Sequence, residues 1–334
     1  MASNNRSMRK AGISILLTLC MLISALPQIS RENNSTVAAA NGNVAVTSGA
    51  AVSTKQPAIT AKPRPSQTVP EGYKPVYDIG DLYSIRDDLS ANYILMNDID
   101  MSVDTAEGGD YDRGNGWEPI QNFKGDFDGN GYRILGMHIF GDTKDKRVGL
   151  FGSTLGTIKN LGVIDCDIDI DCSGSDYERR YVGGIAGSGK TIEGCAVTGK
   201  IQVKDTLDRD YDYRYIGGIT GYTYIESISK CYSTVDITVT GEDGESLTGY
   251  IAGIAGYSYY TDFSQCYYAG KTEGGSAITD TDNSKRFSSC YYLSGSAENG
   301  CYDSYNYSGI VKLTETQMKN QRMFTGFDFD NIWE

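Results

Sequence analysis

Apolar and polar residues alternate over short stretches of this chain, and glycines separate the stretches. In residues 201–203 and 235–239, β-branched side chains occupy every second position and polar side chains lie between them. Alternation with a period of two, together with frequent Gly and no heptad pattern, predicts short strands broken by turns. We therefore expect an all-β protein whose helices are short and confined to its ends.

The strand pattern recurs after residue 147 in units whose last glycines are 35, 34 and 35 residues apart. The units align at 148–152 (VGLFG), 182–187 (VGGIAG), 216–221 (IGGITG) and 251–256 (IAGIAG). A second register follows at 158–161 (IKNL), 192–195 (IEGC), 228–231 (ISKC) and 263–266 (FSQC), with a shortened copy at 287–290 (FSSC). A fixed period in this range is typical of stacked repeats. Each unit thus predicts one coil of a parallel β-solenoid.

Cysteines close the second register in most units. Equivalent positions in stacked coils form a column whose rungs lie about 4.8 Å apart. The predicted interior column is Leu161, Cys195, Cys231, Cys266 and Cys290. Buried Cys behaves as a small apolar side chain, and stacked neighbours on parallel strands rarely meet the dihedral requirement of a disulfide. We expect buried free thiols here, while Cys166 and Cys172 are less well determined.

The ends of a solenoid need covers, because they expose unpaired strand edges and apolar interior. Residues 81–89 have apolar positions at spacings of three and four, which predicts a short capping helix. Residues 314–317 (TETQ) match a capping box, so a second helix is expected over about 315–323. The predicted solenoid domain spans 73–334, with caps at 73–101 and 311–334 and coils at about 102–310.

The first 72 residues are predicted to lie outside this domain. Arg6, Arg9 and Lys10 precede an apolar run at 11–26, which is typical of a signal peptide and short for a membrane span. We assign 1–40 to the signal peptide, with cleavage after 25 or at about 38–40. Residues 41–72 lack Phe, Trp and Tyr, so they predict a disordered linker. We expect a secreted or surface location and no membrane insertion after cleavage.

Composition removes several function classes. The formal net charge is −13, with 43 acidic and 30 basic residues, which argues against a nucleic-acid partner. The single histidine, His138, cannot build a two-His metal site or an HExxH helix. It lies in a strand-like segment and is expected to be structural. We predict no catalytic residue, no metal ligand and no cofactor, with Ca²⁺ as the alternative considered below.

Three stretches resemble bacterial GLUG-motif proteins. They are 149–163 with its relatives at 184 and 218, then 93–134 (YILMNDIDM to FKGDFDGNGYRI), and the closing segment 313–333. The resemblance covers about 77–333 and implies a right-handed parallel β-helix, exported by bacteria and displayed at or near the cell surface. Such repeats also occur in adhesin-like proteins and beside the catalytic unit of immunoglobulin A-cleaving metallopeptidases, a unit that this sequence lacks.

Two loop motifs are interpreted as turns. Residues 184–191 (GIAGSGKT) fit the P-loop pattern, but a P-loop needs a helix after it, and 192–203 is strand-patterned. Residues 126–131 (DFDGNG) resemble the start of an EF-hand loop, yet position 12 is Met137 instead of Glu. A tight turn explains Asp, Asn and Gly there. A Ca²⁺ site at this turn, or elsewhere on the acidic surface, is the alternative.

A row of acids offers another alternative. Asp165, Asp167, Asp169 and Asp171 alternate with apolar residues, which predicts four carboxylates on one outward face about 6.6 Å apart. Acid pairs at such separations can hydrolyse glycosidic bonds. A solvated strand face is the preferred interpretation, because nothing in the sequence desolvates these acids. A polysaccharide-acting β-helix lyase or hydrolase remains the second function considered, and a structural spacer the third.

The leading function is non-catalytic, adhesin-like binding of a host or environmental glycan or protein. Polar loops at 171–180, 204–214 and 241–249 recur at matching places, so they should project from one edge of the stack. Tyrosine-rich turns follow them, and Tyr offers a large contact area with a polar tip. Mutual packing of these tyrosines along the stack is an equally good explanation. The predicted contact residues are Arg179, Arg180, Arg209, Tyr211, Tyr213, Arg214, Tyr222, Tyr224, Tyr257, Tyr259 and Tyr260.

Overall fold

The computed structural model describes residues 68–142, 146–173, 179–205, 214–241, 243–247, 249–281, 286–302 and 308–329. These residues belong to one compact unit that spans 55–334. The predicted signal peptide and most of the predicted linker lie outside the described residues. The described chain is mostly strand with a few short helical turns, so the all-β class is confirmed.

Three sheets contain the strands, and neighbouring strands in each sheet run parallel. The first sheet has eight strands, which follow one another in chain order. They are β1 (Tyr73–Val76), β2 (Asn92–Leu95), β4 (Phe127–Asp128), β9 (Thr157–Lys159), β13 (Thr191–Glu193), β17 (Ser227–Ser229), β22 (Asp262–Ser264) and β25 (Arg286–Ser288).

The second sheet carries the longest strands. In chain order it contains β3 (Ile99–Asp100), β5 (Arg133–Leu135), β6 (His138–Gly141), β10 (Gly162–Asp171), β14 (Ala196–Lys204), β18 (Tyr232–Ser233), β19 (Asp236–Thr240), β23 (Tyr267–Tyr268), β26 (Cys290–Leu293) and β28 (Ile310–Leu313). Strands β10 and β14 each pair with two shorter strands on one side, because the neighbouring strand is interrupted between β5 and β6 and between β18 and β19.

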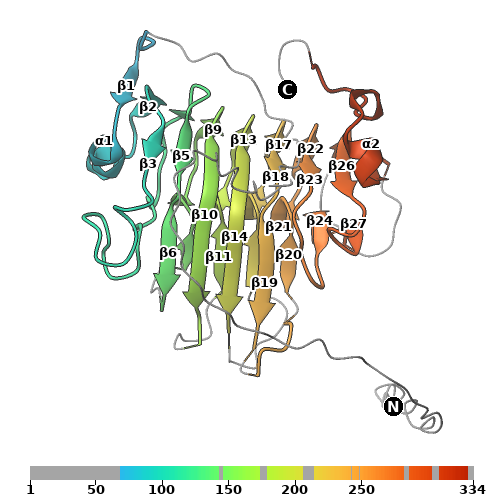
Figure 1. The fold of residues 1–334 in the computed structure, drawn as a ribbon. Helices are drawn as coiled ribbons and strands as arrows, with labels where there is room; N and C mark the ends of the chain where they lie inside the picture. Colours follow the sequence, from blue (N-terminus) through green and yellow to red (C-terminus); the bar gives the residue numbers. More distant parts are fainter. Residues whose placement is uncertain are drawn as a thin grey trace, which may run out of the picture. The chain divides into compact units, whose positions relative to one another are not determined.

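The third sheet contains two strands from each complete repeat. It comprises β7 (Arg147–Val148), β8 (Phe151–Ser153), β11 (Arg180–Gly183), β12 (Ala186–Gly189), β15 (Arg214–Gly217), β16 (Thr220–Tyr224), β20 (Tyr250–Ala252), β21 (Ala255–Tyr259), β24 (Ser276–Thr279) and β27 (Asn299–Cys301). From β9 to β27 the chain visits the first, second and third sheets in turn and then returns to the first, and the last strand, β28, lies in the second sheet. Figure 1 shows the strands side by side in chain order, with α1 (Ile79–Ser84) beside the first strands and α2 (Glu315–Met318) beside the last.

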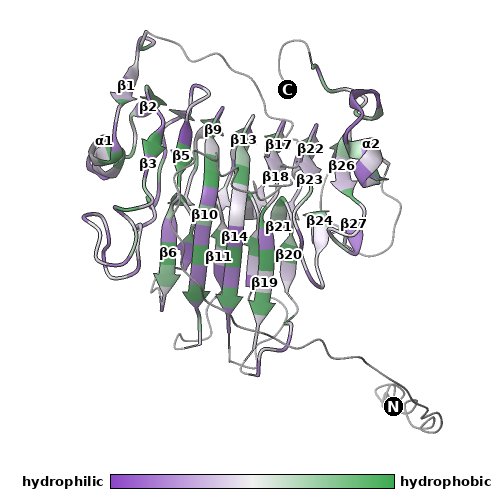
Figure 2. Cartoon of the chain, in the orientation of Figure 1, coloured by the Kyte–Doolittle hydropathy of each residue, from purple (hydrophilic) through white to green (hydrophobic). Residues whose placement is uncertain are grey.

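The apolar core lies between the three sheets. Ile192 of the first sheet, Val197 of the second and Ile185, beside the third, belong to one buried cluster and are fully covered. Buried and more exposed residues alternate along β10 and β19, and Figure 2 shows the corresponding bands of hydrophobic and hydrophilic colour. The period-two pattern of the sequence therefore corresponds to inward and outward side chains.

The last glycine of each aligned segment lies where two backbones approach closely. A Cβ atom on Gly221 would fall 2.5 Å from the carbonyl oxygen of Tyr215 and from the amide nitrogen of Val182. A Cβ on Gly256 would fall 2.5 Å from the amide nitrogen of Ile216. Real Cβ atoms do not come this close to backbone atoms, so only glycine fits. This contact explains why the repeat ends in Gly.

The second register marks the corner between the first and second sheets. The residue before each Leu or Cys has a positive φ, and this holds for Asn160, Gly194, Lys230, Gln265 and Ser289. A left-handed residue turns the chain sharply within one position. The side chain that follows then points inward, and it is buried in each of these five coils. The predicted interior column is confirmed, since the Cys195 amide donates to the Cys231 sulfur at 3.5 Å.

The N-terminal cap forms two residues earlier than the sequence pattern predicts. Helix α1 begins after Asp78, whose carboxylate accepts a hydrogen bond from the Asp81 amide at 2.9 Å, and a 3-10 turn at Ile85–Asp87 continues it. An aspartate at this position satisfies an otherwise unpaired helix amide. Leu82 and Ile85 are fully buried and join the main core. The helix therefore covers the interior at this end.

The C-terminal cap differs from the prediction in what it covers. The capping box is confirmed: Thr314 accepts from the Gln317 amide, and the Gln317 side chain accepts from the Thr314 amide. Helix α2 is only four residues long, however, and a 3-10 turn at Gln321–Met323 follows it. Phe324 packs in a second cluster on outward-facing tyrosines, separate from the main core. The segment covers the outside of the second sheet instead of plugging the interior.

Candidate functional site

Five tyrosines interlock on the outer side of the third sheet. Tyr181, Tyr215 and Tyr250 occupy paired positions of β11, β15 and β20, and their rings stack with centroids 5.0 Å and 5.2 Å apart. Tyr222 and Tyr257, from β16 and β21, stack at 5.7 Å and meet the first column edge to face. We call these five residues the tyrosine face. Its geometry confirms the predicted packing of tyrosines along the stack.

Beside the tyrosine face, four large apolar residues project at the corner that follows β16 and β21. Tyr224 and Tyr259 stack at 5.4 Å, and Tyr260 meets Tyr259 edge to face at 4.6 Å. The exposed fractions are 46% for Tyr224, 48% for Ile225 and 55% for Tyr260. We call Tyr224, Ile225, Tyr259 and Tyr260 the corner patch. Contiguous exposed apolar side chains of this kind often mark interaction sites.

Two residues of the corner patch have strained backbones. Ile225 has a φ of 53° and Tyr260 a φ of 50°, and both side chains are bulky. A β-branched residue in the left-handed region is a genuine outlier, and such strain gathers at functional sites. The Ile225 amide donates to the Tyr259 carbonyl at 2.9 Å, so the next coil holds this conformation in place. This strain is not visible in the sequence, because the pattern of Tyr residues alone predicts an ordinary turn.

Cations border the tyrosine face. The Arg147 guanidinium lies 5.2 Å from the Tyr181 ring centre, and that of Arg179 lies 5.8 Å from the Tyr215 ring centre. Burial is the largest cause that raises the pKa of Tyr222, and the neighbouring tyrosines add to it. The Tyr222 hydroxyl therefore stays protonated at neutral pH and can donate a hydrogen bond. The face combines aromatic area, hydroxyl groups and guanidinium groups.

The predicted contact loops leave one edge of the second sheet. Asp171 and Lys204, at the ends of β10 and β14, are register partners, and so are Lys204 and Thr240 at the end of β19. Each loop leads into a strand of the third sheet, and these three strands, β11, β15 and β20, are paired with one another. Parts of all three loops lie outside the described residues, and the part of the second loop that does so includes the predicted contact residues Arg209, Tyr211 and Tyr213.

Two predicted contact residues are buried instead of projecting. Arg180 and Arg214 are each 3% exposed and pair with one another in the strand register of β11 and β15. Arg214 Nε lies 3.1 Å from Asp205 Oδ2, and both side chains are almost completely covered. Placing these arginines on the loop surface was wrong, because they belong to the base of the loop. Arg179 is exposed, as predicted.

The predicted row of four carboxylates is interrupted. A register irregularity between Val163 and Cys166 places Asp165 in a bulge with a φ of 55°, out of line with the three acids that follow. Asp167 lies 3.1 Å from Lys200 Nζ and 3.9 Å from His138 Nδ1. Burial raises the pKa of Asp171, but hydrogen bonds from Ser173 and the charge of Lys204 outweigh it and leave that pKa lowered. The sequence could not show the bulge, because alternation continues on both sides of it.

Neither loop motif forms the site that its pattern suggests: residues 186–189 of the P-loop pattern are strand β12, so the predicted turn there was wrong, and the acidic motif is a turn that follows strand β4. Residues 191–193 after the P-loop pattern form strand β13, so no helix N-terminus faces the glycines there. In the acidic motif, Asp126 accepts from the Thr157 amide at 2.8 Å, and Asp128 accepts from the Asn130 amide at 2.8 Å. Lys159 lies 3.4 Å from Asp128. The carboxylates stabilise the turn and its contact with the next coil.

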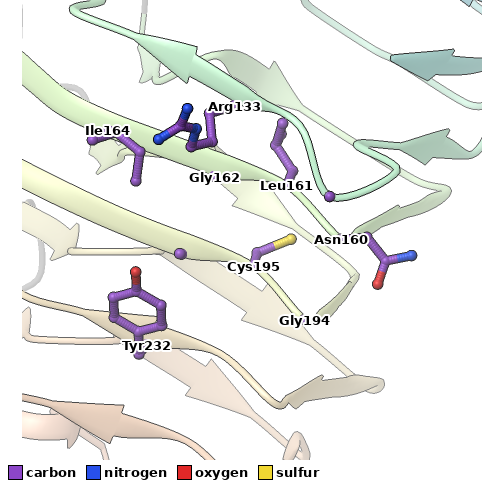
Figure 3. A pocket seen from close by; sticks show the side chains of 10 residues that line it. Arg133, Asn160, Leu161, Gly162, Ile164, Gly194, Cys195 and Tyr232 are labelled. Atoms are coloured by element: carbon purple, nitrogen blue, oxygen red, sulfur yellow. The ribbon is translucent and has the colours of Figure 1, made fainter. Parts of the chain in front are cut away.

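A notch that the sequence analysis missed lies on the outer side of the second sheet, with a volume of about 210 Å³. Figure 3 shows Arg133 on one wall and Tyr232 on the other, with Ile164 beside them. Gly162 and Ala196 lie between Arg133 and Tyr232 in the strand register, which leaves the space open. Two small residues at outward positions of adjacent coils are the signal that would have revealed it.

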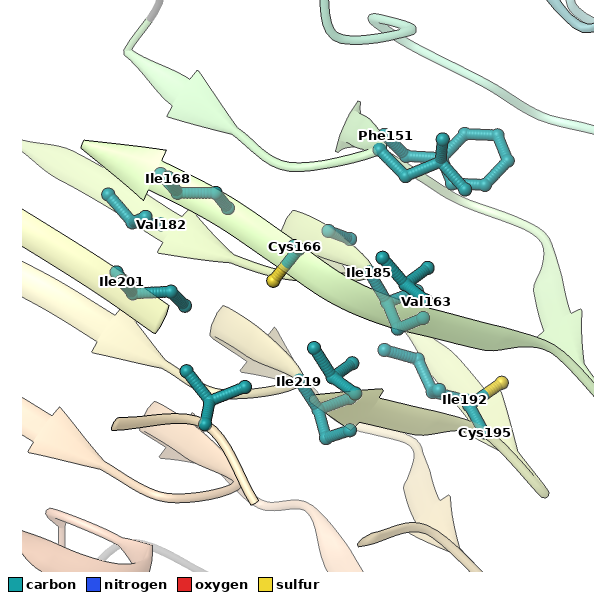
Figure 4. Close-up of a cluster of buried hydrophobic side chains, with 14 of the residues drawn as sticks. Phe151, Val163, Cys166, Ile168, Val182, Ile185, Ile192, Cys195, Ile201 and Ile219 are labelled. Carbon is teal, nitrogen blue, oxygen red and sulfur yellow. The ribbon is translucent and has the colours of Figure 1, made fainter. Parts of the chain in front are cut away.

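The cysteines are free and buried throughout the described chain. They are Cys166, Cys172, Cys195, Cys231, Cys266, Cys290 and Cys301. Figure 4 shows Cys166 and Cys195 among the aliphatic side chains of the core. Burial raises the pKa of Cys166 to about 12, so its thiol stays protonated and unreactive at neutral pH. The predicted free thiols are confirmed.

Two kinds of feature are absent from the part of the chain that the structure describes. No group of three or more His, Cys, Asp or Glu side chains in the described ranges is placed to hold a metal ion. No described helix has the length and apolar character needed to cross a membrane.

Comparison with known proteins identifies one motif. No protein with a curated description matches the chain. A solved structure from Bacteroides ovatus, described as "a putative immunoglobulin A1 protease", is 18% identical, with a TM-score of 0.43 over 72% of this chain and 83% of that one. Residues 212–240 match the family model of the GLUG motif. This match confirms the predicted resemblance to GLUG-motif proteins.

Proposed function

We propose that this chain, which carries a GLUG motif at 212–240, is a non-catalytic, exported repeat protein that binds a glycan or a protein at the bacterial surface. In this proposal the coils wind as a right-handed parallel β-helix, and the protein acts without a cofactor. The corner patch and the tyrosine face form the contact surface.

The corner patch is the observation that carries the proposal. It combines a stacked pair, in which Tyr224 is exposed and Tyr259 is half-buried, with two exposed and strained neighbours, Ile225 and Tyr260. Exposed apolar area and backbone strain both lower stability, so their presence together at one corner favours a function. Rigid tyrosines lose little entropy on binding, and their hydroxyl groups suit glycan hydroxyls or protein backbone.

A polysaccharide-acting enzyme is the less favoured function. Its acids would be Asp167, Asp169 and Asp171, and two of these have lysine partners, at 3.1 Å for Asp167 and 3.7 Å for Asp171. General acid catalysis needs a carboxyl group with a raised pKa, whereas that of Asp171 is lowered.

One assay separates the functions. The purified protein is applied to immobilised mucins, matrix proteins and acidic polysaccharides, with and without Ca²⁺, and each well is also tested for new reducing ends and unsaturated products. We expect attachment without product, and loss of attachment when Tyr224 and Tyr260 are both changed to Ala. Product formation would refute the binding proposal and direct attention to the acids of β10. Attachment that persists in the double variant would refute the corner patch as the contact surface.

A further inference from the structure

A column of tyrosines on the outside of the second sheet stops abruptly. Tyr291, Tyr267 and Tyr232 occupy paired positions of β26, β23 and β18. The next two positions along the same row are Ala196 and Gly162, and Arg133 follows them. The change from large to small side chains leaves the notch of about 210 Å³, closed by a tyrosine at one end and an arginine at the other.

The tyrosine at the end of this column has an unused polar group. Tyr232 is 2% exposed, and its hydroxyl makes no hydrogen bond to any other residue that the structure describes. In Figure 3 this hydroxyl points into the notch, toward the side where Ile164 and Arg133 lie. Burial raises the pKa of Tyr232 to about 12, so the group is a neutral donor and acceptor at physiological pH. The hydroxyl oxygen is not among the fully covered, unpaired side-chain atoms of the described residues, so water reaches it through the notch and a bound polar atom would replace that water.

The arginine opposite it is neutralised. Arg133 Nε donates to Asp98 Oδ2 at 3.2 Å, Nη2 lies 2.5 Å from the same oxygen, and the Arg133 amide donates to Asp98 Oδ1 at 2.8 Å. Its Nη1 has no hydrogen-bond partner among the described residues, so one pair of donors remains available. A guanidinium paired with a carboxylate attracts an anion weakly, and the chain as a whole carries −13. The notch therefore favours a neutral oxygen.

The remaining lining is mixed. Ile164 and Ala196 supply apolar surface, Gly162 adds no side chain, and Asn160, whose side-chain amide donates to Asp128 at 3.0 Å, adds a polar group. A Cβ atom on Gly162 would lie 3.1 Å from Arg133 Cγ, so even one methyl group would narrow the space. The volume is below the roughly 300–1,000 Å³ of pockets for drug-sized ligands, which limits the occupant to about one ring. An apolar patch bordered by separate hydrogen-bonding groups matches a pyranose, whose ring has C–H faces and hydroxyl edges.

We propose that this notch, between Arg133 and Tyr232, binds one neutral sugar ring. Tyr232 and Arg133 Nη1 hydrogen-bond to its hydroxyl groups, and Ile164 and Ala196 contact its apolar face. The inference shares only the glycan class of ligand with the proposed function, because the notch lies on the second sheet and the tyrosine face on the third.

The test uses ligand-observed NMR and calorimetry on the whole protein. The probes are the methyl glycosides of glucose, galactose, mannose and N-acetylglucosamine, with methyl glucuronide as the charged comparison. We expect the protein to bind at least one neutral glycoside more tightly than the glucuronide. Tyr232→Phe should weaken this binding about tenfold, since it removes one hydrogen bond and leaves the ring in place. Ala196→Val should abolish it by filling the notch.

A matched variant separates binding from folding. Tyr291 belongs to the same column, and its hydroxyl donates to the Thr325 carbonyl at 3.0 Å. Tyr291→Phe should lower the melting temperature and leave glycoside binding unchanged. Tyr232→Phe should weaken glycoside binding and leave the melting temperature unchanged. The inference is overturned if no neutral glycoside binds, if the glucuronide binds more tightly, or if Tyr232→Phe binds as the unmodified protein does. The double variant of Tyr224 and Tyr260 keeps the notch intact. It should therefore lose attachment to macromolecules and still bind the glycoside.

Discussion

Two of the stacked tyrosine groups on the outside of this molecule, the column on the second sheet and the corner patch, differ in how far they are covered. Tyr232 and Tyr267 stack at 5.0 Å, and Phe324 closes over the column, with its ring 4.9 Å from that of Tyr291. Tyr224 and Tyr259 stack at 5.4 Å, yet Tyr224 remains 46% exposed. Equal stacking with unequal cover indicates different roles. The covered column stabilises the fold, and the corner patch has apolar area left for a ligand.

The covered column should be the more sensitive of the two to mutation. Phe324 is 2% exposed and belongs to the same cluster as Tyr232, Tyr267 and Tyr291. Phe324→Ala should lower the free energy of unfolding in urea by about 3–5 kcal/mol, because it removes a buried ring and leaves a cavity. Leu155→Ala, at a side chain that is 63% exposed, is the control and should change it by about 0.5 kcal/mol or less. Equal effects of the two changes would show that the C-terminal segment is not a structural cover.

Alkaline pH should also act on the covered column. Burial raises the pKa of Tyr232 to about 12, so the folded state keeps this phenol neutral while the unfolded state ionises near its ordinary value of 10.0. The resulting stability is fully present below pH 10 and is lost as the pH rises toward 12, by about 1.4 kcal/mol per unit. Tyr232→Phe should remove this slope from the denaturation curves. Buried thiols such as Cys166 add a similar loss, which stays the same in the variant. An unchanged slope would contradict the assignment to Tyr232.

Relief of the strain in the corner patch should raise the free energy of unfolding, whereas the changes in the covered column lower it. Ile225 has a φ of 53°, a conformation that Asn tolerates far better than a β-branched residue. Ile225→Asn should raise the free energy of unfolding by about 1 kcal/mol, which is the scale of the left-handed penalty. The same variant should attach less well to the ligand surface, because it removes exposed apolar area. A loss of stability comparable to that of Phe324→Ala would show that Ile225 is packed as core and not displayed.

Much of the covered architecture was predictable from the sequence. The terminal glycines and the Cys column recur at a fixed period, since each repeat meets the same backbone contact and the same interior. The capping box at Thr314 is a local pattern, so it too is visible in the sequence. These features depend on residues close together in the chain or on strict repetition.

Features that depend on the register between coils were less predictable from the sequence. The notch depends on Gly162 and Ala196 lying in register between Arg133 and Tyr232, and that register joins residues 29 to 36 positions apart. The bulge at Asp165 shifts the strand register, but the alternation of acidic and apolar residues continues across it. The row of acids therefore looks continuous in the sequence. Arg180 and Arg214 are buried because they lie at the base of the loops. Charged residues are normally exposed, so the sequence predicted exposure for both.

The smallest expected change in stability accompanies the largest expected change in binding. Tyr224→Ala combined with Tyr260→Ala removes side chains that are 46% and 55% exposed, so the free energy of unfolding should move by about 0.5 kcal/mol or less per change. Attachment to the mucin, matrix protein or polysaccharide that binds the unmodified protein should fall tenfold or more, because exposed aromatic residues dominate the energy of interfaces. Tyr224→Phe is the matched control, since it keeps the stacked ring and loses only the hydroxyl. Retained attachment in that variant would assign the binding energy to ring area, and loss would assign it to the hydroxyl. If the double Ala variant unfolds as readily as Phe324→Ala does, the corner patch is a structural ladder like the covered column, and the contrast between the two groups fails.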